Sequence, residues 1–158
     1  MKIPLIITCY LLFFSSCIRV SNTNSFLSQD FKGYFNNVLI VTETNDNLNL
    51  SSVAKELNAN FKQKNINSDL SSIASFDGSF PAELDNLNEN IKYILVMQRF
   101  GENAGEVNIA LKLFEKATKN QVWNSQIEVK SVLSNSDISF VTSQIVSLMD
   151  KDRIFASN

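Results

Sequence analysis

Apolar residues between positions 38 and 61 follow a pattern that predicts a buried strand and then a helix. Residues 38–42 form an unbroken run, Val-Leu-Ile-Val-Thr, which ends before the turn-forming residues 45–47. Such a run indicates a strand that is buried on both faces. Beyond the turn, apolar residues recur at spacings of three and four, which is typical of an amphipathic helix. They are Leu50, Val53, Ala54, Leu57 and Phe61.

The region between residues 65 and 91 has a weaker pattern that leaves strand and helix open. The apolar positions within residues 66–73 are compatible with a short edge strand, and Asp77-Gly78 predicts a turn. Pro81 suits the first position of a helix. Residues 84–91 would then continue that helix, with apolar positions at 84, 87 and 91.

Residues 93–130 contain three apolar segments separated by turns, which predicts a three-stranded antiparallel meander. Residues 93–97 are apolar throughout, as in a strand buried on both sides. Residues 107–113 and 123–129 alternate between apolar and polar positions, which is typical of half-buried strands. In the last of these strands Trp123 lies on the apolar side.

A final helix is expected after residue 134, because Ser134 and Asp137 have the spacing of a capping box. Its apolar stripe consists of Ile138, Val141, Ile145 and Leu148. The expected element order is therefore β-α-(β/α)-β-β-β-α. We predict a two-layer α+β fold, in which a mixed β-sheet contains the antiparallel meander and both long helices pack on one face.

The first seventeen residues have the pattern of an export signal. Lys2 precedes a nearly unbroken apolar run, residues 3–14, which is too short to span a bilayer and has the length of a signal-peptide core. The next residues, Ser15-Ser16-Cys17, complete a stretch from Phe14 that resembles the lipobox of bacterial lipoproteins. The alternative is a plain signal peptide in which Cys17 is incidental.

The lipobox resemblance implies a signal peptide at residues 1–16 and lipidation of Cys17, through which the chain would be anchored in a membrane. No Asp directly follows Cys17, which by the same resemblance implies the outer membrane, with the domain facing the periplasm. We interpret residues 17–30 as the lipidated cysteine and a flexible tether. Residues 31–158 are interpreted as a single α/β domain.

Composition limits the chemistry that this domain can perform. The chain has no histidine, which excludes Ser-His and Cys-His catalysis and His-ligated metals. Its 14 basic and 16 acidic residues give a net charge of −2, so nucleic acid is not an expected partner. The two cysteines are Cys9 and Cys17, and cleavage before Cys17 leaves no second thiol. We predict no enzyme activity, no catalytic or metal-binding residue and no cofactor.

Three other patterns are weaker as candidate sites. The residues at positions 45–56 echo an EF-hand loop but lack its first Asp and its glycine. The closest carboxylate pairs, Glu83 with Asp85 and Asp150 with Asp152, do not share a helix face. Three aromatic residues are expected to belong to the core rather than to a ligand platform: Tyr93, Phe100 and Trp123.

The stretch from residue 92 to residue 130 resembles a hairpin found in small envelope proteins, with Lys119-Asn120 where Gly-Lys is usual and Trp123 in the second strand. Examples are the curli-secretion lipoprotein CsgG, the penicillin-binding-protein activator LpoB and the amino-terminal domain of TolB. The resemblance implies a non-enzymatic role in which the domain binds, assembles or activates an envelope protein partner. The oligomeric state stays open. The alternative is a periplasmic small-ligand or lipid carrier, which predicts an apolar cavity between sheet and helices.

Overall fold

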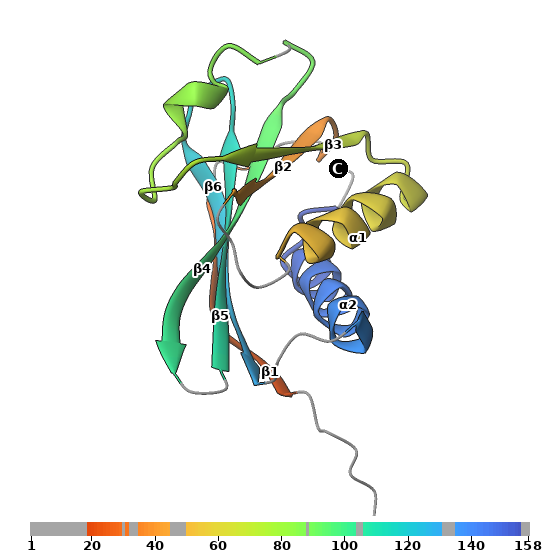
Figure 1. The fold of residues 1–158 in the computed structure, drawn as a ribbon. Helices are drawn as coiled ribbons and strands as arrows, with labels where there is room; N and C mark the ends of the chain where they lie inside the picture. Colours follow the sequence, from red (N-terminus) through yellow and green to blue (C-terminus); the bar gives the residue numbers. More distant parts are fainter. Residues whose placement is uncertain are drawn as a thin grey trace, which may run out of the picture.

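The computed structural model describes residues 19–29, 31, 35–44, 50–87, 89–103, 106–130 and 135–155. Within these residues one mixed six-stranded sheet carries two long helices on one face (Figure 1), so the predicted α+β class is confirmed. The sheet order is β1-β6-β5-β4-β2-β3. In chain order the elements are β1 (Arg19–Leu27), β2 (Val38–Glu43), α1 (Leu50–Gln63), β3 (Ser68–Ile73), η1 (Ala82–Leu84), β4 (Tyr93–Asn103), β5 (Glu106–Glu115), β6 (Gln121–Lys130) and α2 (Asn135–Lys151).

The sheet joins a parallel part to an antiparallel part. Strand β2 pairs in parallel with β3 on one side and with β4 on the other, and α1 forms the crossover from β2 to β3. Strands β4, β5 and β6 form the predicted antiparallel meander. The short strand expected within residues 66–73 is present as β3, at one edge of the sheet.

The main core lies between the sheet and the two helices. All five residues of the predicted stripe on α1 are buried. On α2, Ile138, Val141 and Ile145 are buried as predicted, whereas Met149 takes the buried place that we assigned to Leu148. The reason is that 3.6 residues make one helical turn, so a stripe that continues from Ile145 can use a spacing of four instead of three.

The opposite face of the sheet carries a second apolar cluster beneath residues 74–91. Phe76 and Leu84 are buried against the outer sides of the central strands, and the Phe76 and Phe80 rings each meet Phe114 edge to face. The helix expected from Pro81 is reduced to the single turn η1. Since this segment has little regular structure, side-chain contacts must hold it on the sheet.

Lysine side chains from β5 and the turn after it supply many of these contacts. Lys112 Nζ donates a hydrogen bond to the Gly78 carbonyl at 3.0 Å and lies 5.3 Å from the centroid of the Phe76 ring. Lys116 Nζ donates to the Leu87 carbonyl at 2.6 Å. Lys119 Nζ lies 2.6 Å from a carboxylate oxygen of Asp85. Three cations thus fasten the segment to the sheet.

The expected flexible tether is corrected by the structure, because residues 19–27 form the edge strand β1. Eight residues of β1 are paired in register with β6, and the register shifts between Asn22 and Asn24. Leu27 packs against the main core, whereas Phe26 is exposed on the other face. An edge strand with a solvated face needs few apolar residues, which is why the polar sequence of β1 resembled a linker. Residues 17, 18 and 30 lie outside the described residues.

We predict that β1 stabilises the domain. Replacing residues 19–27 with a Gly-Ser linker of equal length is expected to lower the free energy of unfolding by about 3 kcal/mol or more, through lost strand pairing and lost burial of Leu27. Urea denaturation followed by circular dichroism measures the loss. As a control, Lys55→Gln on the exposed side of α1 should leave the midpoint unchanged. An unchanged midpoint for the β1 variant would restore the tether interpretation.

Candidate functional site

Part of the second sheet face is left uncovered by residues 74–91, which lie over its upper part in Figure 1. Side chains on this uncovered part come from four neighbouring strands, β1, β6, β5 and β4. Five of them are carboxamides, and we call this surface the amide face. Its residues are Asn24, Gln98, Asn108, Asn124 and Gln126.

Strand register places these amides in rows across the sheet. In one row Asn24 is opposite Gln126, Gln126 is opposite Ala110, and Ala110 is opposite Gln98. Asn24 and Gln126 are exposed, and the small Ala110 is buried between its longer neighbours. Each carboxamide offers donors and an acceptor without a net charge. Glu128, which is opposite Asn108, lies on the same side of β6 as Gln126 and is half-buried. The rows therefore present a hydrogen-bonding surface in which carboxamides outnumber charged groups.

An exposed aromatic residue borders this surface on the edge strand. Phe26 is 57% exposed and is opposite Asn124 in the register of β1 and β6. In the same row Lys112 points toward residues 74–91, because its ammonium group binds the Gly78 carbonyl. On the far side, Gln98 Nε2 donates to the Phe76 carbonyl at 2.9 Å. The contacts of residues 74–91 with Lys112 and Gln98 thus set the boundary of the amide face.

The three aromatic residues considered from the sequence do not form one platform. Trp123 and Tyr93 are buried in the main core as predicted, whereas the expectation that Phe100 is a core residue is wrong, since it is 37% exposed. Trp123 Nε1 donates a hydrogen bond to Asp152 Oδ2 at 2.8 Å. Burial, and to a lesser extent the negative charge of Glu115, raise the pKa of Tyr93 above its ordinary value.

Each carboxylate pair has a member that is engaged in a structural contact. Asp85 binds Lys119, and Asp152 accepts the hydrogen bond of Trp123. Elsewhere, hydrogen bonds from the side chain and backbone of Ser79 lower the pKa of Asp77. Across the described part of the chain, no group of three or more His, Cys, Asp or Glu side chains is placed to hold a metal ion.

Two of the sequence hypotheses fall outside the described residues. Cys17 is one, and the EF-hand echo is the other, because residues 45–49 are not described. Among the described helices, none is both long and apolar enough to span a bilayer.

The space between sheet and helices, where a carrier would hold its ligand, is occupied by side chains. Leu95 and Leu111 from the sheet and Leu57 from α1 are fully buried members of one cluster. A hollow of about 470 Å³ lies elsewhere, open to solvent at the end of the sheet where β4 begins, and mixes charged with apolar residues. It is lined by Glu89, Ile91, Lys92, Tyr93, Glu115, Lys116 and Ala117.

Sequence reasoning did not find the amide face. The alternation in residues 107–113 and 123–129 does place Asn108, Asn124 and Gln126 on the polar side of their strands. The alternation does not reveal that β1 pairs with β6, which adds Asn24 to the surface. It also does not reveal where residues 74–91 lie, which determines the part of the sheet face that stays uncovered.

No protein-family model matches the chain, and no curated protein matches it. Among solved structures, the PelC dodecamer from Paraburkholderia phytofirmans is similar, with 16% sequence identity and a TM-score of 0.47, over 84% of this chain and 94% of that chain. A point-substituted form of the same protein has 12% identity and a TM-score of 0.47, over 80% and 91% of the two chains.

Proposed function

We propose that this protein is a lipoprotein of the bacterial outer membrane, anchored through Cys17, whose periplasmic domain binds a protein partner and catalyses no reaction. The observation that carries partner binding is the amide face, a carboxamide-rich part of the sheet bordered by the exposed Phe26. The support for the anchor is the lipobox-like stretch ending at Cys17 and the lack of any other cysteine beyond it.

The chemistry of the amide face suits a protein interface. The buried centres of such interfaces are depleted in charged residues and enriched in aromatic ones. Carboxamides can exchange bonds to water for bonds to a partner, since each carries donors and an acceptor. Phe26, at 57% exposure, would lose the most apolar surface to a partner and would serve as the anchor residue. Strand β1 also leaves its outer edge unpaired within the described sheet, as in peptide recognition by strand addition.

Site-specific crosslinking in intact cells tests this proposal. A photoreactive amino acid at Gln126 is expected to form an adduct of discrete mass with one envelope protein, identified by mass spectrometry. The matched control carries the same group at Ala59, which is exposed on α1, away from the amide face. Adding Phe26→Ser to the Gln126 probe should reduce the adduct about fivefold or more, because loss of an aromatic anchor residue weakens binding by about 1 kcal/mol or more.

Phe26→Ser should change the free energy of unfolding by less than about 0.5 kcal/mol, because the side chain lies on the surface. If the stability is unchanged, a smaller amount of adduct in the Phe26→Ser variant is due to weaker partner binding and not to unfolding. Equal amounts of adduct from the probes at Gln126 and Ala59 would contradict partner binding at the amide face. So would an amount of adduct that Phe26→Ser does not change.

A further inference from the structure

The described strand β1 begins very close to Cys17 in the chain. One residue, Ile18, separates Cys17 from Arg19, the first residue of β1. Two residue steps span at most about 7 Å, whereas a tether up to residue 30 would span about 45 Å. An anchor at Cys17 therefore holds the start of β1 at the membrane surface.

Strand register shows which end of the domain contains the start of β1. Arg19 is opposite Lys130, the last residue of β6, and Val129 is opposite Val107 near the start of β5. The same end contains the end of β4 at Asn103. Helix α2, which is separated from β6 by four residues, also begins there (Figure 1). We call this part of the domain the lower end.

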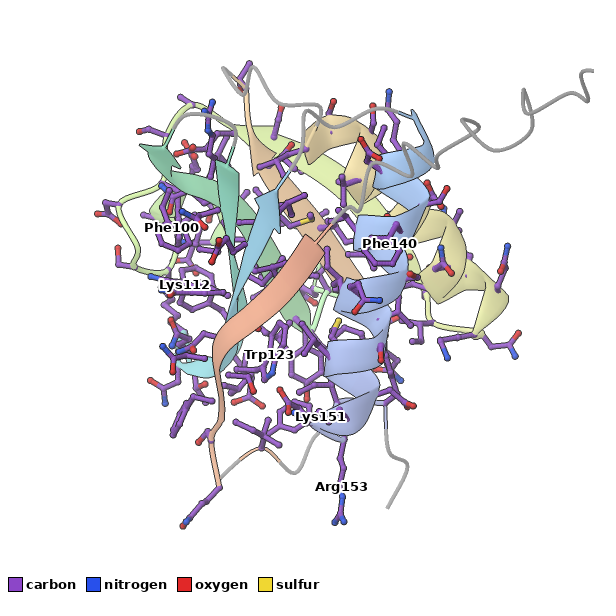
Figure 2. The ribbon with its side chains drawn as sticks, turned by 90° about the horizontal axis from the view of Figure 1, so that it is seen from below. Phe100, Lys112, Trp123, Phe140, Lys151 and Arg153 are labelled. Carbon is purple, nitrogen blue, oxygen red and sulfur yellow. The ribbon has the colours of Figure 1, made fainter. Side chains whose placement is uncertain are left out.

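Two exposed phenylalanines lie toward the lower end. Among the described residues the exposed large hydrophobic side chains are Phe26, Leu70, Phe100 and Phe140. Phe100 is three residues before the end of β4, is 37% exposed and lies near the lower end. Phe140 lies in the second turn of α2 and is 38% exposed. Figure 2 looks at the molecule from below and shows Phe100 on the sheet and Phe140 on α2, with strands between them.

We propose that the lower end rests on the bilayer that holds the Cys17 anchor, with Phe100 and Phe140 inserted into the interfacial region of the lipid. This inference rests on the proposed anchoring at Cys17. Phenylalanine side chains of peripheral proteins bury at the boundary between lipid headgroups and acyl chains, and apolar groups that enter the lipid strengthen the binding given by an acyl chain. Phe26 lies near the other end of β1, opposite Asn124, so the part of the amide face around Asn24 and Asn124 extends away from the lipid and stays open to a partner. Asn108, close to the start of β5, lies toward the lower end.

Fluorescence quenching by brominated lipid tests this placement. The mature chain from Cys17 onward, which contains every described residue, is coupled through the Cys17 thiol to a maleimide lipid in phosphatidylcholine vesicles. Single variants Phe100→Trp, Phe140→Trp and Phe26→Trp carry the reporter. The native Trp123 is fully buried in the core, so its emission serves as a constant background in every sample.

We expect brominated lipid to quench roughly half of the added emission at positions 100 and 140, since an interfacial side chain lies within reach of the bromines. The Phe26→Trp variant and the unsubstituted chain should be unaffected. Equal quenching at position 26, or none at positions 100 and 140, would overturn the placement. In this experiment the lipid is coupled to Cys17 chemically, so the result does not depend on acylation in cells. A lack of acylation at Cys17 in cells would be a separate result and would overturn both the anchor and this placement.

Discussion

Cys17→Ser is expected to abolish incorporation of labelled palmitate and to leave the chain as an uncleaved precursor. By resemblance to bacterial lipoproteins, the thiol is the acylated group and acylation precedes cleavage before Cys17. A serine hydroxyl is not an equivalent nucleophile, because thiol chemistry depends on the readily formed thiolate. Autoradiography of the immunoprecipitated protein measures the label, and mass spectrometry shows whether residues 1–16 have been removed.

The chain provides a matched control for this experiment in its other cysteine. Cys9 lies within the apolar run of the signal segment, so Cys9→Ser should leave both label and cleavage unchanged. An inhibitor of the lipoprotein signal peptidase should make the wild-type chain accumulate as a precursor. Palmitate incorporation that is the same in wild type and Cys17→Ser would disprove the anchor.

Trp123→Ala is expected to lower the free energy of unfolding by about 3–5 kcal/mol, the cost of removing a large aromatic side chain from a packed core. Trp123 is fully buried and heads the largest fully buried side chains among the described residues. Its indole N–H also donates to Asp152 Oδ2 at 2.8 Å, which connects β6 to the residue after α2. Urea denaturation monitored by circular dichroism gives the change without relying on the lost fluorophore.

Two further variants separate packing from hydrogen bonding at Trp123. Trp123→Phe keeps most of the ring and removes the donor, and a double-mutant cycle with Asp152→Ala should give a coupling energy of about 1 kcal/mol. Phe100→Ala is the matched aromatic control on the surface, where a loss below about 0.5 kcal/mol is expected. A loss at Trp123→Ala no greater than at Phe100→Ala would mean that the helix layer does not pack on β6 as described.

The lysine contacts of residues 74–91 connect the fold with the proposed binding surface. Lys112 lies in the row of side chains that begins with Phe26 and Asn124. Its charge is directed at the Gly78 carbonyl and the Phe76 ring, so it is not presented among the amides. A Cβ at Gly78 would lie 3.0 Å from Lys112 Nζ, and the residue has φ of +98°. Glycine at this turn therefore preserves the contact that shields the charge.

Much of the fold could be predicted from residue pattern because its signal is local. A strand buried on both faces needs consecutive apolar residues, and β2 shows them at residues 38–42. A strand with one buried face needs alternation, which placed Trp123 and Ile127 on the buried side of β6. The stripe on α1 was complete because helical periodicity fixes which residues share a face.

The failures share a different physical cause, since they concern residues whose role depends on what lies next to them in space. Phe100 has the residue type and strand position of a core aromatic, yet it is 37% exposed because the segment covering that face ends before it. Strand β1 has no strong apolar pattern because it is paired with β6 through backbone bonds, and every residue except proline can make those bonds.

The sequence by itself therefore determined the strands and helices with buried faces and the lack of histidine chemistry, and it is the source of the proposal that Cys17 is an anchor. Each of these depends on residue type and spacing along the chain. Only the tertiary structure decided that residues 19–27 form a strand, that residues 74–91 cover part of one sheet face, and that Asn24, Gln98 and Gln126 share the part left open. Strand pairing and coverage join residues far apart in sequence, and no local pattern encodes which surface remains open.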